Sequence, residues 1–220
     1  MKLILSKSIL VISIIYFSAI DSEGQKKAEV LIPKFNDQYT SYVKKLEGGE
    51  FNINFKEFRE SFIKSEQFRI ASKKNSEFEK LKKDMYEHIA KSDYHKIVKI
   101  TKAMLSIDYT SMLAHKVLRQ TYSFLGDSVN TIKYRTIQLG LLNSIIKKGD
   151  GKTHATAWHV VQMEEENFIL HLLGAKITKQ SVENAHGIFD KMEVNIKGEK
   201  QVYYFEISKI FEGYKYLEKK

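Results

Sequence analysis

The sequence contains no cysteine and a single proline. The lack of cysteine excludes disulfides, thiol nucleophiles, zinc–thiolate sites, iron–sulfur clusters and a lipid anchor on an N-terminal cysteine. The lone Pro33 excludes collagen-like segments and proline-rich linkers. The rest is ordinary for a folded protein, because 43% of the 220 residues are hydrophobic and 29% are charged. This length allows one or two small domains with a real core.

Arginine is also scarce, although the chain is basic. Lysine and arginine together number 36 against 27 acidic residues, which gives a net charge of +9. Arginine is the preferred side chain for phosphate and guanine, and the sequence has no RNA-binding, zinc-finger or basic-zipper pattern. We therefore interpret the charge as a solvated lysine surface and expect no nucleic-acid partner, while binding of an anionic polymer through the lysines stays open. The four arginines are Arg59, Arg69, Arg119 and Arg135.

The N-terminus has the pattern of a secretory signal peptide. An apolar run, Ser8–Ile20, follows a short stretch with two lysines. As a helix this run would reach only about 20 Å, short of the roughly 30 Å hydrocarbon core of a bilayer. The small residues Ser22 and Gly24 predict a signal peptide over 1–24, although cleavage after Ala19 is an alternative. We expect an exported protein, periplasmic or extracellular, that meets a membrane only if this segment stays uncleaved.

Residues 25–50 are weakly patterned, and we interpret them as a leader with at most one short helix. The pattern changes at residue 51. Phe55, Phe58 and Phe62 follow the spacing of one helix face, while Lys56 and Arg59 point elsewhere. This stretch predicts an amphipathic helix whose aromatic stripe packs into a core.

Helical spacing is strongest between Glu77 and Lys148, where apolar residues recur with a period of 3.6. The breaks between the periodic segments are short, which predicts consecutive packed helices. The four predicted stripes are Phe78, Leu81, Met85, Ile89; Tyr94, Ile97, Val98, Thr101, Met104, Leu105; Ala114, Val117, Leu118, Thr121, Tyr122, Leu125; and Ile132, Thr136, Leu139, Ile146.

Two of these breaks suggest a repeat. Asp93 and Asp127 are natural helix N-caps that lie 34 residues apart, and Gly126 suits the left-handed end of a helix. Thirty-four residues is the period of the tetratricopeptide helical hairpin. The consensus Trp and Gly of that repeat are missing, so residues 51–148 are predicted to form tetratricopeptide-like hairpins that need neighbouring structure as caps.

The C-terminal region, 149–220, has a different period. Residues 155–161 predict a strand, 164–173 a helix, and 181–189 another short helix. Alternating residues on both sides of Lys197–Lys200 predict a hairpin with a four-residue loop, and helical spacing returns afterwards. The predicted fold class is α+β, mainly α: helical hairpins followed by a small antiparallel sheet of about three strands, packed together as one domain.

Several groups of residues, taken in chain order, resemble a known family. They are Phe55-x2-Phe58-Arg59-x2-Phe62-x2-Ser65-x2-Phe68, Gly149-Asp150-Gly151-Lys152-Thr153 with Ala157, Val160-Val161 with Glu164-Glu165, and Tyr203-Tyr204-Phe205-Glu206-Ile207. The pattern is similar to an uncharacterised family of short exported proteins of Bacteroidetes-type bacteria, a domain of unknown function. The resemblance spans roughly 51–214 and implies export and a helical-plus-sheet domain, but no activity or catalytic residue.

One loop could carry chemistry. Asp150 lies between two glycines, and with His154 or Glu165 it could bind a cation or transfer a proton. The same Gly-Asp-Gly sequence suits a tight turn, which is the interpretation that we favour. A glycosidase pair has no fixed spacing, so a small envelope hydrolase or glycan-acting enzyme with a site near Gly149–Thr153 is the alternative function. Serine hydrolase motifs are absent.

Metal and cofactor sites are not predicted. His159, Glu164 and His171 carry zinc-compatible groups, but their spacing alone does not make them converge. The run Glu164–Glu166 is better explained as the acidic start of a helix, and Trp158 as a core residue, although an indole can also stack on a sugar. We assign no catalytic residue, no metal and no cofactor.

The function expected from the sequence is that of an exported, non-enzymatic interaction module. Helical hairpins offer a concave surface for a protein or peptide partner of the envelope without a reactive group. A groove beside His115, Arg119 and Tyr122 would favour this function, whereas a pocket that unites Asp150, His154 and Glu165 would favour the enzyme. The candidate binding residues are therefore Asp150, His154, Glu165, His115, Arg119 and Tyr122.

Overall fold

A computed structural model describes residues 29–218 of the chain; the predicted signal peptide lies outside the described residues. The first helices are α1 (Gln38–Glu47), α2 (Phe55–Phe62) and α3 (Glu66–Lys73). Each begins at a polar cap, because the side chains of Asp37, Asn54 and Ser65 accept from backbone N–H groups of the first turn. The predicted aromatic helix is α2, and its Phe58 and Phe62 are buried.

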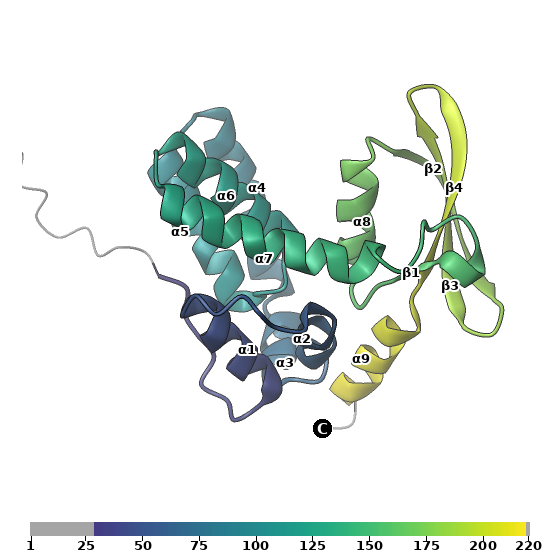
Figure 1. The fold of residues 1–220 in the computed structure, drawn as a ribbon, viewed down its shortest axis with the longest axis horizontal. Coiled ribbons are helices and arrows are strands. Elements are labelled where there is room, and N and C mark those ends of the chain that lie inside the picture. Colours follow the sequence, from purple (N-terminus) through teal and green to yellow (C-terminus); the bar gives the residue numbers. More distant parts are fainter. Residues whose placement is uncertain (1–28, 219–220) are drawn as a thin grey trace, which may run out of the picture.

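Four longer helices follow and pack on one another in sequence order, as helical hairpins do (Figure 1). Asp93 and Asp127 are N-caps as predicted, since their Oδ1 atoms accept from the N–H of Lys96 and Asn130. Gly126 has a φ of +72°, the left-handed conformation expected at the end of a helix. The helices are α4 (Asn75–Ala90), α5 (Tyr94–Ile107), α6 (Met112–Phe124) and α7 (Ser128–Ile146).

The predicted stripe of α7 is wrong in phase. Ile132 is 61% exposed and Leu139 is 36% exposed. Apolar residues occur all around this helix, so periodicity alone could not choose the inward face. The residues that α7 buries are Tyr134, Ile137, Gln138, Leu141 and Ile145.

The sheet has four strands and is mixed, whereas about three antiparallel strands were predicted. The predicted strand over 155–161 shrinks to two residues, because residues 154–156 form a turn of 3₁₀ helix. The resulting strand runs parallel to the last one and pairs Trp158 with Phe205. The sheet order is β1-β4-β3-β2, with β1 (Trp158–His159), β2 (Lys176–Asn184), β3 (Ile188–Ile196) and β4 (Glu199–Glu206).

The predicted helix over 181–189 is wrong, because these residues belong to β2, β3 and the turn between them. The edge strand β2 is exposed along most of its length, so it lacks the alternating burial that would have marked it as a strand. The hairpin predicted around Lys197–Lys200 is confirmed as the pair β3 and β4, but its turn is two residues long and not four. Lys197 and Gly198 both have positive φ angles, +52° and +94°, as a type I′ turn requires.

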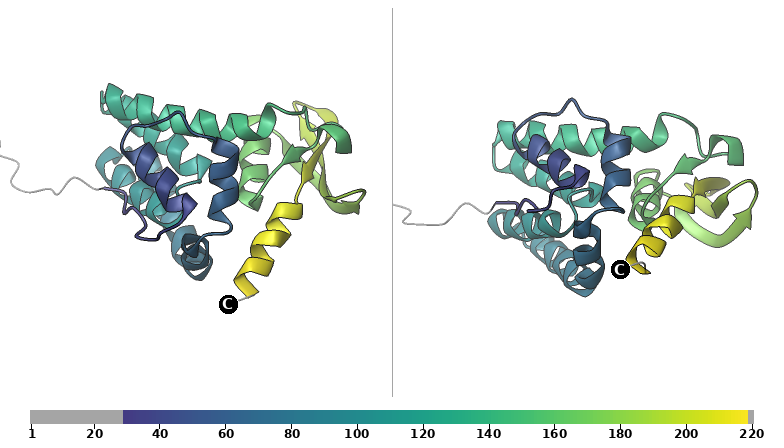
Figure 2. Two further views of the ribbon diagram at one scale, coloured as in Figure 1. Left: turned by 60° about the horizontal axis from the view of Figure 1, so that its bottom comes forward. Right: turned by 90° about the horizontal axis from the view of Figure 1, so that it is seen from below.

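The helix α8 (Met163–Leu172) lies between the helical layer and the sheet, and α9 (Ser208–Glu218) returns from the sheet toward α2 and α3 (Figures 1 and 2). Gly213 permits that approach, since a Cβ atom there would lie 3.3 Å from Ile63 and 3.4 Å from the ring of Phe68. One continuous hydrophobic core extends from α1 to α9. The predicted fold class, α+β and mainly α, is confirmed.

Candidate functional site

A groove of about 580 Å³ opens between the helical layer and the pair α8 and α9. Its walls come from α3, α4, the turn between α5 and α6, the start of α8, and α9, so segments far apart in sequence meet around it. The residues that line it are Phe62, Phe68, Ala71, Ser72, Asn75, Phe78, Lys82, Tyr86, Ile107, Asp108, Thr110, Ser111, Met112, Leu113, Val161, Gln162, Met163, Glu164, Glu165, Asn167, Phe168, His171, Ile210, Tyr214 and Leu217.

The walls of this groove are rich in aromatic side chains. Phe68 and Phe78 approach it from α3 and α4, and Phe168 from α8. At its edge Tyr86 and Tyr214 are 51% and 49% exposed. Aromatic groups that are open to solvent on one side provide contact area at low entropic cost, which is common at binding surfaces.

One end of the groove is polar and is built around Asp108, the residue that ends α5. Its Oδ1 accepts from the backbone N–H of Thr110 at 2.8 Å and from the Thr110 hydroxyl at 2.6 Å. The Thr110 hydroxyl in turn accepts from the side-chain amide of Gln162 at 2.8 Å. This short chain of hydrogen bonds fixes the carboxyl group at the wall of the groove.

A negative charge on the side chain of Asp108 is energetically unfavourable at this position. The pKa of Asp108 is raised to about 6, because burial and, to a smaller extent, Glu164 at the start of α8 raise it more than the hydrogen bonds from Thr110 and Gln162 lower it. A carboxyl group with a perturbed pKa in a groove is a candidate for function.

Beneath the groove, Arg59 of α2 forms a buried ion pair with Glu165 of α8. Its Nε and one terminal nitrogen donate to the two carboxylate oxygens at 2.6 and 2.8 Å. The guanidinium also donates to the Ser144 hydroxyl of α7 and to the carbonyl oxygen of His159 in β1. Arg59 lies off the aromatic stripe of α2 but is buried, because Glu165, 106 residues later, compensates its charge.

The carboxylate of Glu165 completes this arrangement by accepting from the backbone N–H of Val161 at 2.7 Å. The side chains of Arg59 and Glu165 are only 2% and 4% exposed. A single bidentate pair thus connects α2, α7, β1 and α8, and it sets the position of α8, which forms one wall of the groove.

The next residue, Glu166, is buried on the other side of α8 against Asp190 of β3. Burial, together with the nearby carboxyl groups of Asp190 and Glu165, raises its pKa to about 8. Gln180 donates to one oxygen of Asp190 at 2.9 Å. The other oxygen of Asp190 and Oε1 of Glu166 are buried without a hydrogen-bond partner among residues 29–218. A carboxyl group with this pKa is mostly protonated at neutral pH.

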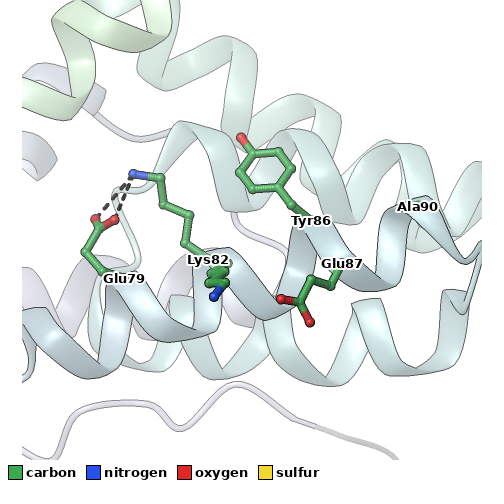
Figure 3. Close-up of a pocket in the computed structure, with 6 residues that line it drawn as sticks. Glu79, Lys82, Tyr86, Glu87 and Ala90 are labelled. Atoms are coloured by element: carbon green, nitrogen blue, oxygen red, sulfur yellow. Dashed lines mark hydrogen bonds and ion pairs between the residues drawn. The ribbon is translucent and has the colours of Figure 1, made fainter.

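A second, shallow hollow lies on the surface of α4. Figure 3 shows Lys82 and Tyr86 on the same side of this helix, with Glu87 directed away. The ammonium group of Lys82 is held by Glu79 at 3.3 Å. Because Lys82 and Tyr86 also line the groove, the hollow continues the edge of that groove.

The loop that holds Asp150 forms a tight turn, as the favoured interpretation had it. Its Oδ1 accepts from the N–H of Lys152 and from the hydroxyl of Thr156, and these bonds lower the pKa of the exposed carboxyl group. His154 pairs with Glu183 at 3.0 Å. Of the trio Asp150, His154 and Glu165, only Glu165 lines the groove.

His115, Arg119 and Tyr122 do not form a groove on α6. His115 is fully buried with Nε2 2.7 Å from the carbonyl oxygen of Tyr109, and burial lowers its pKa to about 4. Tyr122 stacks on Tyr134 in the core, with ring centroids 5.7 Å apart. Only Arg119 is partly exposed. The apolar phase of α6 therefore takes two of these three side chains inward.

The histidine and carboxylate set weighed for zinc is not assembled. His159 lies 3.2 Å from Glu206, while Glu164 and His171 belong to the groove. In the described part of the chain, no three metal-binding side chains of the His, Cys, Asp or Glu type come together. Trp158 is a core residue as expected: it is 6% exposed and stacks on Tyr203.

Sequence reasoning missed Asp108 and did not predict the burial of Arg59. Asp108 lies in a short break between two helices, and the residues next to it in the sequence form no motif that would predict a groove. Arg59 carried a weak signal, because an arginine is rare in this lysine-rich chain and this one lies between two core phenylalanines. Only the fold brings its partner close.

A comparison with protein families shows the family of this chain. The model of a protein family, Domain of unknown function (DUF4919), matches residues 34–216. That range includes every element of the groove. No match was found among curated proteins or among solved structures. No helix within residues 29–218 has the length and apolar character needed to cross a membrane.

Proposed function

The chain belongs to the DUF4919 family, and on that premise we propose that it is a binding module that holds a segment of a partner protein in its groove. The single observation that supports this proposal is the groove itself, with aromatic walls and a polar end. Its volume of about 580 Å³ is in the usual range for ligand sites. The binding surface proposed on α6 from the sequence is thus replaced by the groove.

The frame of the groove supports the same proposal. A binding surface gains affinity when its walls are already in place before the ligand arrives. The buried pair of Arg59 and Glu165 fixes α8 against α2 and α7, and the close contact at Gly213 fixes α9 against Phe68. Both walls are therefore held by the core, and a ligand does not have to order them.

A selection of random peptides displayed on phage, with the purified full-length chain as bait, tests this proposal. The affinity of each selected peptide is then measured by fluorescence anisotropy with Ser72→Trp and with Asn167→Trp. Both substituted residues are exposed and line the groove, so a bulky side chain there fills space without disturbing the core. We expect each substitution to weaken binding at least about tenfold, the equivalent of about 1.4 kcal/mol.

Ser123→Trp is the matched control, because Ser123 is an exposed helix residue outside the groove. It should leave affinity unchanged, and thermal unfolding should show that all three variants are folded. If no selected peptide is sensitive to the groove substitutions, the proposed function is wrong.

A small hydrolase is the second candidate, and one observation favours it. Asp108 has a pKa of about 6 within the groove, which suits proton transfer near neutral pH. The site would then lie at Asp108 and not at the Gly149–Thr153 loop, where Asp150 is occupied by its turn. Chromogenic glycosides and peptide anilides provide the test. Turnover that Asp108→Asn reduces by about a hundredfold or more would establish the enzyme.

We also propose that the protein acts outside the cytoplasm. The support is the cationic and apolar pattern of residues 1–24 together with the resemblance to exported proteins. Mass spectrometry of the chain recovered from its native cells tests this proposal. A new N-terminus at Gln25 is the expected result, and an intact N-terminus in the cytosolic fraction would contradict export.

A further inference from the structure

The charges that line the groove differ in sign from those of the whole chain. The chain carries a net charge of +9, but the fixed charges in the groove are mainly acidic. Lys82 is held by Glu79, and Glu165 is neutralised by Arg59. Asp108 and Glu164 have no ion-pair partner among residues 29–218.

From this juxtaposition we propose that the polar end of the groove is a subsite for a lysine or arginine side chain, so that the partner is a basic peptide segment with apolar residues beside its cation. The inference rests on the proposed binding function and names the chemistry of its ligand. The cation would pair with Asp108, and its apolar neighbours would lie along Phe68, Phe78 and Phe168.

The geometry of the polar end supports a cation more than any other group. Thr110 directs its N–H and hydroxyl to Oδ1 of Asp108 and thereby fixes the plane of the carboxyl group before the ligand binds. Glu164 adds a second negative charge close enough to raise the pKa of Asp108. A bound cation would remove both the repulsion between these carboxylates and the cost of burying the charge of Asp108.

Charge also favours a segment of another polypeptide over a second copy of this chain. Two copies, each with a net charge of +9, repel one another at long range, whereas a local basic segment on a neutral or acidic partner does not. A free amine could satisfy Asp108 but would leave the aromatic walls of the groove without contacts. A peptide that joins a cation to apolar side chains uses both parts of the groove.

The test uses the peptides selected on the full-length chain and their neutral analogues. In each peptide, lysine is replaced by norleucine or arginine by citrulline, which removes the charge and keeps the length of the side chain. We expect the neutral analogues to bind about ten to a hundred times more weakly, because a hydrogen bond to a charged group is worth that much. Asp108→Asn keeps the oxygen that Thr110 requires, and it should cause a similar loss.

A double-mutant cycle makes the test specific. The neutral peptide should bind equally to the native chain and to Asp108→Asn, because the interaction is already absent. Glu164→Gln, at an exposed position, should weaken the basic peptides by a smaller factor. Glu199→Gln is the matched control, since Glu199 is exposed at the start of β4 and remote from the lining of the groove. It should have no effect.

The outcomes separate this inference from the proposed function. Peptides that are sensitive to Ser72→Trp but lack basic residues, or that bind Asp108→Asn unchanged, would overturn the basic subsite and leave the binding module intact. Peptides that ignore the groove substitutions would overturn both. Competition by butylamine as strong as that of the peptide would show a small amine site instead. A dimer in sedimentation velocity that Ser72→Trp dissociates would identify a second copy as the occupant.

Discussion

Glu165 and Glu166 are neighbours in sequence and both are buried, yet α8 places them in opposite electrostatic environments. Glu165 faces the helical layer, where Arg59 and the N–H of Val161 satisfy its charge. Glu166 faces the sheet, where the titratable group with the largest effect on it is another carboxyl group, Asp190. One carboxyl group is stabilised as an ion by a cation, and the other is stabilised by keeping its proton.

This difference shows how a helix between two layers can use adjacent polar residues in unlike ways. Side chains at consecutive helix positions point about 100° apart. The three glutamates of the run therefore face the groove, the helical layer and the sheet, respectively. Glu164 remains exposed at the groove. The cost of burial is offset by the Arg59 ion pair for Glu165 and by the retained proton for Glu166. The same stretch of sequence therefore supplies part of the groove wall, a structural ion pair and a group whose pKa lies near 8.

The largest expected effect is at the ion pair. Arg59→Met removes the guanidinium and leaves Glu165 buried without its cation. We expect a loss of about 3–5 kcal/mol in the free energy of unfolding, measured by urea denaturation at pH 7. Lys209→Met breaks an exposed pair with Glu212 and should cost less than about 1 kcal/mol. Equal losses for the two variants would show that burial does not distinguish these pairs.

The next effect is at Glu166 and depends on pH. Its pKa is about 8 in the folded protein against 4.5 for an ordinary glutamate. Its contribution to stability is therefore complete below pH 4.5 and is lost as the pH rises to about 8. Glu166→Gln should remove this dependence and stabilise the protein at pH 8.5 by up to a few kcal/mol. Thermal unfolding of both proteins at pH 5 and pH 8.5 measures it, and parallel profiles would refute the assignment.

The smallest effect concerns the donor that serves Asp190. Gln180→Leu removes the amide that donates to this buried carboxyl group, and we expect a loss of about 1 kcal/mol. Thr178→Leu is the control, since Thr178 lies two residues away on the same exposed strand and its hydroxyl donates to a carbonyl oxygen. Urea denaturation at pH 7 compares them. A larger loss at Thr178 would mean that the Asp190 environment tolerates an unsatisfied acceptor.

Much of the fold could be predicted because its signals are local. The stripes of α5 and α6 and the caps at Asp93 and Asp127 are read within a few residues of one another. The phase of α7 and the strand β2 could not be read in this way. Ile132 and Leu139 are exposed although they are apolar, and β2 is an edge strand without alternating burial. In both cases contacts with the neighbouring layer determine which residues are buried, and the sequence of the segment alone does not.

The candidate site was much less predictable. Glu165 was among the candidates, but its partner is 106 residues away in the chain. Asp108 has no motif around it, and its raised pKa arises from burial against elements that follow much later in the sequence. Asp150, which did have a motif, completes its hydrogen bonds within its own turn. A local pattern here marks a local structure, whereas the groove depends on the tertiary fold.

The lining of the groove extends from Phe62 to Leu217, and this span has a consequence for when the groove can form. Synthesis proceeds from the N-terminus, so α9 is the last wall to leave the ribosome. The site exists only once α9 has folded back onto α3. The groove is therefore complete only after the whole domain has been synthesised, and a protease that removes α9 would remove one of its walls.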